Sequence, residues 1–324
     1  MNLFSTVGVQ AKEEIAAKAL SHYILAEVFE RLDRLNEAVN EYKAAIDEDP
    51  FSPQLRLNLA AALIKQNKLD KAIPELKRVI SLASADEASR PEPITIESHT
   101  ILALIYSLQG KIDEAADEYE SALRGALASD PQNIRIHKSL GQIYLQQKRL
   151  AEARKTYEFM LNLSADDAEV YFYLGMIDEE EGRRQEAINN FKTALELNPE
   201  YPDALNSLGY LYAEESLNLG EAESMLEKAL QYEPHNGAYL DSLAWTYYKQ
   251  GRNQEAIQGL EEAVQFLLDP VIFEHLGDAY FKEGIINKAI ENWEKSLQIK
   301  PENNSALKEK IQKHKEALQG GGGS

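Results

Sequence analysis

Apolar and small residues recur along the chain with the spacing of α-helices, and polar residues fill the positions between them. The clearest stretch holds two such patterns, one on each side of Gly182. Their apolar and small positions are Val170, Tyr171, Leu174 and Gly175 in the first, and Ala187, Phe191, Ala194 and Leu195 in the second. Side chains three and four residues apart share one face of a helix, so this spacing predicts two amphipathic helices joined by a short turn.

The same helix pair recurs from one end of the chain to the other. Each unit has a small residue, then twelve residues later an alanine as a rule, then an aromatic residue or leucine. The first small residue is Ala26, Ala60, Ala103, Gly141, Gly175, Gly209, Ala244 and Gly277, at intervals of 34, 43, 38, 34, 34, 35 and 33 residues. This period predicts an array of repeats rather than two globular domains. We expect eight repeats, at residues 19–52, 53–86, 96–129, 134–167, 168–201, 202–236, 237–269 and 270–303.

Residues between the paired helices indicate how the chain turns. The turn needs a residue that tolerates positive φ, and glycine or a substitute stands at this register. These residues are Gly110, Gly182, Gly251 and Gly284, with Asn67 and Asp33 as substitutes. The second helix of each pair is then expected to begin at a capping side chain, as at Asn36, Asp70, Asp113 and Asn287. Small residues at the first position and at the start of the second helix predict a close crossing of the two helices.

These positions resemble the tetratricopeptide repeat (TPR). The pattern L-G-x2-Y occurs at Leu208, Gly209 and Tyr212 and again at Leu276, Gly277 and Tyr280. The resemblance covers residues 19 to 303 and implies an all-α, right-handed superhelical solenoid of about eight helix-turn-helix units. Residues 1–18 are expected to extend the first helix, and residues 304–319 to form a polar capping helix. Residues 320–324 read GGGGS, a flexible linker of the kind added to recombinant proteins.

A narrower resemblance concerns the compartment. Residues 205–260 are similar to a stretch common in bacterial cell-envelope TPR lipoproteins. This likeness implies a bacterial origin and a periplasmic or cell-envelope location, with the cytoplasm as the alternative. A leader segment trimmed from the N-terminus is part of the first interpretation.

Two departures from the period interrupt the array. Residues 84–93 insert a loop with two prolines, and the third repeat gains four residues before Asp130 and Pro131. An exposed insertion is the ordinary interpretation, and a hinge or a dimer contact is the alternative.

Composition excludes several classes of function. The chain has 54 acidic and 34 basic residues, a net charge of −20, and no cysteine. Nucleic-acid binding requires clustered Lys and Arg, and thiolate metal sites and disulfides require cysteine. No run of residues is apolar enough to cross a membrane. The six histidines are scattered and no catalytic or phosphate-binding motif is present, so we expect no enzyme, no metal and no cofactor.

The TPR resemblance implies where a partner would bind. In this family, positions 2, 5, 9, 12 and 13 of each repeat face the concave surface. From these positions we take as candidate partner-binding residues Phe172, Met176, Asn206, Tyr210, Asp241, Trp245, Tyr248, Lys249, Glu274, Asp278 and Phe281. The arrangement of lysine, asparagine and arginine with which some family members hold acidic C-termini is absent, since only Asn58 fits one of its positions.

Charge favours the same half of the chain. Residues 168–303 carry 26 acidic and 10 basic side chains, a net charge of −16, and the rest carries −4. We therefore expect a partner protein or peptide with basic and apolar residues, steered by carboxylates and contacted by aromatic side chains. The alternatives are an acidic surface that only maintains solubility, with the aromatics packed between repeats; a self-assembling homo-oligomeric platform; and an envelope accessory protein that recruits a protease or an export machine.

Overall fold

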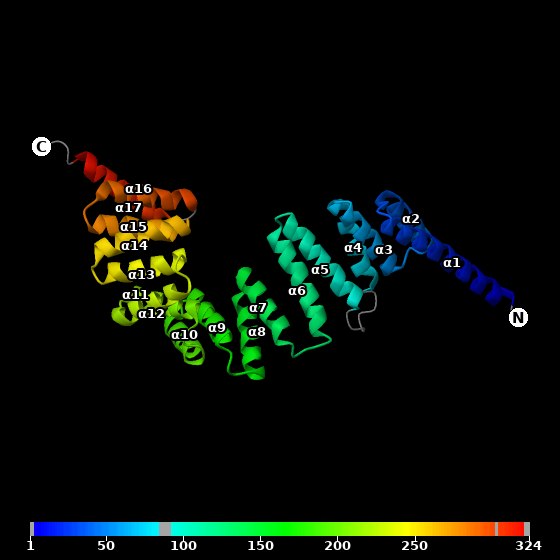
Figure 1. Ribbon diagram of the computed structural model, residues 1–324, viewed down its shortest axis with the longest axis horizontal. Helices are drawn as coiled ribbons and strands as arrows, with labels where there is room; N and C mark the ends of the chain where they lie inside the picture. Colours follow the sequence, from blue (N-terminus) through cyan, green and yellow to red (C-terminus); the bar gives the residue numbers. More distant parts are fainter. Residues whose placement is uncertain (1–2, 84–91, 302–303, 321–324) are drawn as a thin grey trace. The chain divides into compact units, whose positions relative to one another are not determined.

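The computed structural model describes residues 3–83, 92–301 and 304–320, and these residues form helices joined by short turns (Figure 1). They fall into two compact units, residues 1–163 and 164–324, which are described separately. The unit boundary lies four residues before the end of the fourth repeat expected from the sequence. Most of the expected loop at residues 84–93, and four residues of the GGGGS segment, lie outside the described residues.

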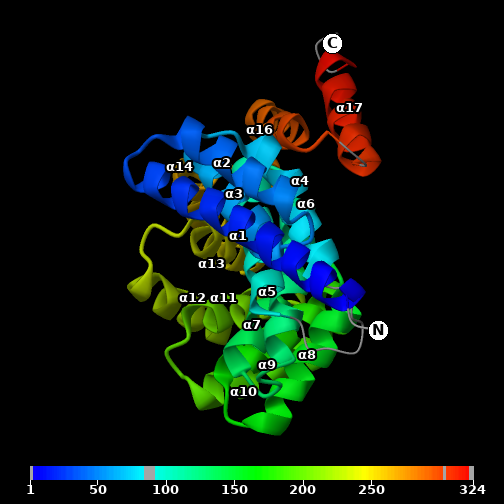
Figure 2. The same ribbon diagram turned by 90° about the vertical axis from the view of Figure 1, so that its right-hand side faces the viewer.

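The first unit contains eight helices among its described residues. Their bounds are α1 Leu3–Arg31, α2 Leu35–Glu48, α3 Pro53–Lys65, α4 Leu69–Ala83, α5 Pro93–Leu108, α6 Ile112–Leu127, α7 Ile134–Gln146 and α8 Leu150–Leu163. Consecutive helices pack as antiparallel pairs, and each pair packs on the next. The first helix continues without a break through the residues expected to extend it, as both views show (Figure 2).

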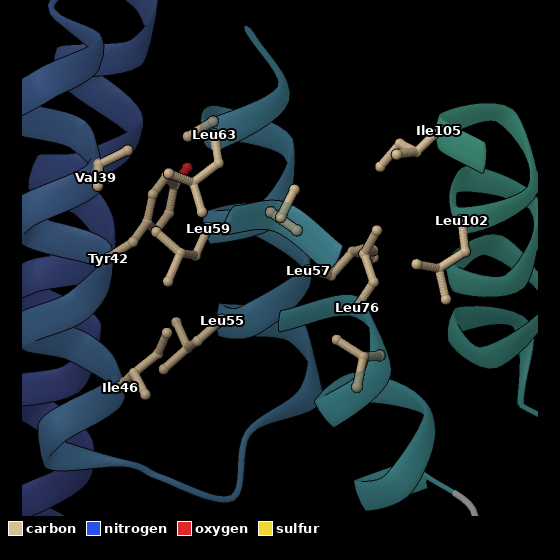
Figure 3. Close-up of a cluster of buried hydrophobic side chains, with 14 of the residues drawn as sticks. Val39, Tyr42, Ile46, Leu55, Leu57, Leu59, Leu63, Leu76, Leu102 and Ile105 are labelled. Carbon is tan, nitrogen blue, oxygen red and sulfur yellow. The ribbon is translucent and has the colours of Figure 1, made fainter. Parts of the chain in front are cut away.

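The core of the first unit lies between the paired helices. Side chains of α2, α3, α4 and α5 meet in one cluster (Figure 3). Tyr42 is fully buried there, and its hydroxyl oxygen lies 2.9 and 2.8 Å from carboxylate oxygens of Glu27 and Glu30 of α1, to one of which it donates its proton. The phenol therefore joins the first helix pair through both its apolar ring and its polar end.

The second unit contains nine helices among its described residues. Their bounds are α9 Ala168–Glu180, α10 Arg184–Leu197, α11 Pro202–Glu214, α12 Leu219–Tyr232, α13 Gly237–Lys249, α14 Asn253–Phe266, α15 Pro270–Lys282, α16 Ile286–Ile299 and α17 Ser305–Gly320. The first helices of successive pairs also contact one another, as α11 contacts α13 and α13 contacts α15. The last helix, α17, packs on α16, and its Leu307 and Ile311 are buried in the core.

The turn residues adopt the expected backbone conformation. Gly110, Gly182, Gly251 and Gly284 have φ between 72° and 81°, and both Asp33 and Asn67 have φ of 57°. Lys148, Ser216 and Asn218 also have positive φ, which the sequence did not predict. Lys148 and Ser216 stand at the register of the turn glycines, where the tight turn requires a left-handed backbone, whereas Asn218 is the N-cap residue of α12.

The expected helix caps are wrong. The second helices begin one residue earlier, at Leu35, Leu69, Ile112 and Ile286, so Asn36, Asp70, Asp113 and Asn287 lie within the first turn. At Arg34, for example, the backbone N–H instead bonds back to the Phe29 carbonyl oxygen at 2.8 Å. The N-cap position is instead filled by Arg34, Lys111 and Ile285, whose side chains make no cap hydrogen bond.

The small residues of the motif allow the paired helices to cross closely. A Cβ added at Gly175 would lie 2.6 Å from a ring carbon of Phe191, which is fully buried. We expect Gly175→Leu to lower the free energy of unfolding by about 1–3 kcal/mol, because the new side chain would collide with the buried Phe191 ring. Urea unfolding measures this loss. The control is Gly220→Leu, since no atom lies within 4 Å of a Cβ added there; an equal loss in both variants would contradict the close-crossing explanation.

Candidate functional site

A cavity of about 290 Å³ opens among the first helices of four successive pairs in the second unit. It is lined by residues of α9, α11, α13 and α15 and of the turn that precedes α15. The lining residues are Glu179, Asn206, Ser207, Tyr210, Ala238, Asp241, Ser242, Leu267, Asp269, Val271 and Ile272. We call this cavity the groove pocket. Three carboxylates line it and no lysine or arginine does, so its electrostatic character is acidic.

Three of the candidate residues lie together in the groove pocket. Asn206 and Tyr210 come from adjacent turns of α11, and Asp241 comes from the facing surface of α13. The sequence missed Leu267 and Asp269, because inward positions were assigned only within helices and these two residues precede α15. Asp269 has a structural task as well, since its carboxylate accepts the Val271 backbone N–H at 2.7 Å and caps α15.

Asp241 is buried and joined to the next helix pair. Its Oδ1 lies 2.9 Å from Nδ1 of His275 on α15, and both side chains are about 10% exposed. A buried carboxylate needs such a partner to offset its desolvation. The pair therefore fixes the orientation of Asp241 beside the groove pocket.

Trp245 is stacked between repeats and leaves little surface for a partner. Its indole lies parallel to the rings of His275 and Tyr248, with centroid distances of 3.8 and 4.6 Å. The indole N–H donates to Glu214 of α11, and the side chain is only 8% exposed. Lys249 Nζ lies 5.2 Å from the ring centroid. In this position Trp245 holds His275, and through it Asp241, in place; a direct partner contact by Trp245 stays a prediction.

The remaining candidate residues lie outside the groove pocket. Phe172 is buried against Phe191 and Tyr201, whereas Met176 is 38% exposed.

Near the C-terminus, Asp278 accepts the Trp293 indole N–H at 2.7 Å and forms an ion pair with Lys310 of α17. Phe281 packs on His314 of the same helix, 4.4 Å between ring centroids. Glu274 is half-buried on α15. Partner contacts by these residues stay predictions.

Two polar residues of α11, Asn206 and Tyr210, line the groove pocket. Burial raises the pKa of the Tyr210 hydroxyl, and the nearby carboxylates of Glu214 and Asp241 raise it further. The phenol is therefore a neutral hydrogen-bond donor at physiological pH. The buried side-chain oxygen of Asn206 has no hydrogen-bond partner among the described residues. An amide at such a place can pair with the backbone of a bound segment.

Glu179 is a partly desolvated carboxylate at the edge of the groove pocket. Burial raises its pKa; the charges of Glu180 and Glu214 raise it too, and Arg184 lowers it. Because the folded-state pKa is raised, this group's contribution to stability is complete at acid pH and is lost as pH rises through the raised pKa. The same rise in pH creates the negative charge that would attract a cation.

We expect Glu179→Gln to raise the free energy of unfolding at pH 7, by on the order of 0.5 kcal/mol, because the desolvated charge is removed. In the wild type, stability should decrease as pH rises from the ordinary pKa range of glutamate to neutral. The variant should not show this decrease. Urea unfolding across this pH range, with the exposed Glu262→Gln on α14 as control, measures both effects. A stability loss at pH 7 specific to Glu179→Gln would contradict this description.

The described residues hold neither a candidate metal site nor a candidate membrane span. No group of three or more His, Asp or Glu side chains in this part of the chain could hold a metal ion. None of the described helices combines the length and apolar character needed to cross a bilayer.

Comparison with known proteins identifies the repeats. A family model described as "Tetratricopeptide repeat" matches residues 31–89, 106–172 and 215–270, and one described as "TPR repeat" matches residues 180–215. The TPR repeat-containing protein PA4667 of Pseudomonas aeruginosa is 25% identical over 170 residues, which are 52% of this chain and 28% of that protein. Protein O-mannosyl-transferase Tmtc3 of Drosophila melanogaster is 26% identical over 151 residues, 47% of this chain and 16% of that protein. The chain thus matches only a minor part of the length of these relatives.

Solved structures agree on the fold. The crystal structure of a tetratricopeptide repeat protein from Parabacteroides merdae superposes with a TM-score of 0.58 at 19% identity, and covers 81% of this chain and 98% of its own. TPR proteins generally mediate protein–protein interactions and scaffolding, and the repeat fold is typically non-enzymatic, although relatives such as Tmtc3 carry the name of an enzyme. The family matches cover well over half of the residues, and the chain belongs to the tetratricopeptide repeat family.

Proposed function

We propose that this protein is a non-enzymatic interaction scaffold whose second unit binds a partner segment with basic and apolar residues in the groove pocket. The observation that carries this proposal is the convergence of α9, α11, α13 and α15 on one acidic cavity. A peptide that lies along this surface would contact four repeats at once.

Charge supports a basic partner. The second unit holds 30 acidic and 14 basic side chains, a net charge of −16, against −4 for the first unit. Glu179, Asp241 and Asp269 line the groove pocket itself. A lysine or arginine placed among them would be attracted at long range and would relieve the repulsion between carboxylates.

Apolar surface supports an anchoring side chain. Leu267 and Val271 line the groove pocket and are 39% and 47% exposed, and Ile272 lies beneath them. Covering this surface with an aliphatic or aromatic side chain would remove apolar area from water. The helices that carry these residues are already packed, so binding orders little of the protein and more of the interaction free energy appears as affinity.

Calorimetric titration of the full chain tests the proposal. The basic probe is a soluble peptide of about ten residues in which lysines flank one leucine and one phenylalanine, and the neutral probe has glutamine in place of each lysine. We expect saturable binding of the basic probe, binding of the neutral probe that is weaker by at least about fivefold, and weaker binding of the basic probe above about 0.15 M salt. Equal affinity for both probes, or no saturable heat, would overturn the proposal.

Self-association is the second candidate function, and the surface of α1 favours it. Leu20, Ile24 and Val28 lie one turn apart on this helix and are 56%, 52% and 47% exposed. An apolar row of this kind is typical of an interaction surface. Sedimentation velocity over a concentration series distinguishes self-association from binding of a separate partner. A monomer at every concentration would exclude self-association through α1.

A further inference from the structure

The four-residue insertion of the third repeat coincides with an opening in the first unit. The second helix of this repeat, α6, has 16 residues, whereas α2 and α8 have 14 each. The junction between α6 and α7 is packed less closely than the other junctions between successive pairs of this unit. A space lies beside this junction.

This space is a cavity of about 360 Å³ between α6, α7 and α8. We call it the junction pocket. Its lining residues are Arg124, Leu127, His137, Leu140, Tyr144, Glu152, Lys155, Thr156 and Phe159. Two of the three helices are the second members of their pairs, so the junction pocket is not part of the surface formed by the first helices.

The floor of the junction pocket is apolar. Leu140 and Tyr144 are buried on α7, and Leu127 is half-buried at the end of α6. Phe159 on α8 is 39% exposed, and its ring centroid lies 4.7 Å from that of His137. An apolar side chain of a ligand would contact this aromatic surface and exclude water from it.

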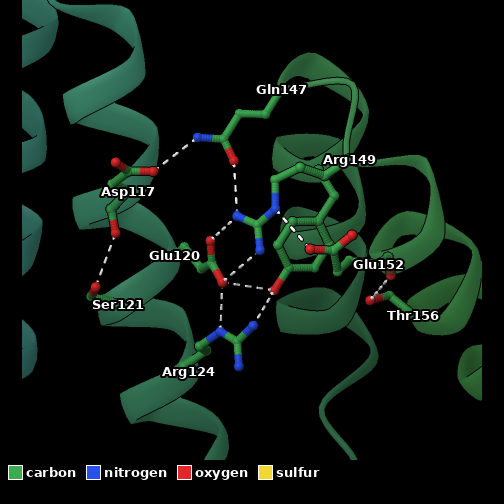
Figure 4. Close-up of polar contacts among 9 residues, drawn as sticks. Asp117, Glu120, Ser121, Arg124, Gln147, Arg149, Glu152 and Thr156 are labelled. Carbon is green, nitrogen blue, oxygen red and sulfur yellow. Dashed lines mark hydrogen bonds and ion pairs between the residues drawn. The ribbon is translucent and has the colours of Figure 1, made fainter.

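Arg124 is held at the rim by a hydrogen-bond network (Figure 4). Glu120 accepts from Arg124 Nε at 2.7 Å and from Arg149 Nη1 at 2.5 Å. Burial raises the pKa of Glu120, but hydrogen bonds from Arg149, Arg124 and Tyr144 outweigh it, so the pKa lies below its ordinary value. One carboxylate is thus shared by two guanidinium groups. The Arg124 side chain is 60% exposed, and part of its set of five N–H donors remains for an anion.

Lys155 and His137 also lie at the rim. Lys155 is exposed on α8 and forms no ion pair within the described chain. His137 Nε2 lies 2.8 Å from the Pro131 carbonyl oxygen and donates to it. The one carboxylate of the lining, Glu152, is paired with Arg149 at 3.0 Å. The three cations at or beside the rim, Arg124, Arg149 and Lys155, therefore outnumber the two carboxylates, Glu120 and Glu152, around an apolar floor.

We infer that the junction pocket is a second docking site, which binds an acidic segment of a partner protein that carries an aliphatic or aromatic side chain. Arg124 and Lys155 contact the carboxylates, and Phe159 and Leu127 contact the apolar side chain. Charge complementarity selects the partner: this site attracts carboxylates, whereas the groove pocket of the second unit repels them.

Binding of an acidic probe to the full chain tests this inference. The acidic probe has the sequence of the basic probe with glutamate in place of every lysine. We expect saturable binding in fluorescence polarisation, and a loss of affinity of at least about fivefold in Lys155→Glu and in Phe159→Ala. Both residues are exposed enough for the variants to fold, and neither belongs to the groove pocket, so the affinity for the basic probe should remain unchanged.

Matched controls separate the junction pocket from general charge and hydrophobicity. Lys43→Glu changes the charge of the first unit by the same amount at an exposed site on α2, and Phe51→Ala removes a ring that is 72% exposed. Affinity for the acidic probe should stay within about twofold of the wild type in both controls. Absence of saturable binding to the wild type, or equal losses in Lys155→Glu and Lys43→Glu, would overturn the inference. The basic probe tests the groove pocket of the second unit. A negative result with the acidic probe would therefore leave the proposal for the groove pocket unaffected.

Discussion

Replacement of Trp245 by alanine is expected to lower the free energy of unfolding by about 3–5 kcal/mol. The indole is 8% exposed, stacks on His275 and Tyr248, and donates its N–H to Glu214. Truncation removes these contacts and leaves a cavity between α11, α13 and α15. We also expect binding of the basic probe to become less favourable by at least about 1 kcal/mol, roughly the hot-spot threshold, because His275 would no longer hold Asp241 in position. Urea unfolding and calorimetric titration measure the two effects on the same sample.

Trp245→Phe serves as the matched variant. A phenyl ring keeps the stacking surface but cannot donate to Glu214, so most of the stability should return. A Trp245→Ala protein with nearly wild-type stability and strongly reduced affinity would contradict the structural role. That result would favour the direct partner contact that the sequence pattern predicts.

Replacement of Asp241 by asparagine is expected to weaken binding of the basic probe about tenfold, equivalent to about 1.4 kcal/mol. Asparagine has nearly the same shape, and its side-chain oxygen can still accept from His275 Nδ1. The substitution therefore removes the charge at the groove pocket and retains the packing. Calorimetric titration with the basic and the neutral probe separates charge from shape, because affinity for the neutral probe should change little.

Glu262→Gln is the control for Asp241→Asn. It removes one negative charge from the second unit at an exposed position on α14, away from the groove pocket. We expect its affinity for the basic probe to stay within about twofold of the wild type. If both variants weaken binding equally, the net charge of the unit, and not the position of Asp241, controls affinity.

The features that the sequence predicted correctly depend on local backbone and helix physics. Helical periodicity reports which face of a helix is apolar, and Gly182 or Gly284 reports a turn whose φ is positive. These determinants act within one helix pair, so they can be read from residues close in sequence. The caps at Asn36 and Asn287 were wrong because each helix begins one residue earlier than expected, which places Arg34 and Ile285 at the N-cap position.

The candidate site could be predicted only in part, because exposure depends on the neighbouring repeat. Asn206, Tyr210 and Asp241 line one cavity. Trp245 has the register of a groove residue, but its ring is covered by His275 from the following repeat. Asp278 is held by Lys310 of the last helix. Nothing in the local sequence of either residue reports these distant partners.

The junction pocket illustrates the same limit. The extra residues before Asp130 were visible in the repeat spacing, but their length alone does not show which side chains surround the resulting space. Arg124 and Lys155 lie 31 positions apart in the sequence and meet at one rim only because α6 and α8 lie on either side of the opening.

Photo-cross-linking of the basic probe, followed by mass spectrometry, tests the location of partner binding most directly. With a photoreactive group beside the central phenylalanine, the predicted result is attachment to segments of α11, α13 and α15 around Tyr210, Ala238 and Val271, with excess unlabelled probe preventing it. Attachment confined to α12, α14 or α16, or to the first unit, would contradict binding at the groove pocket.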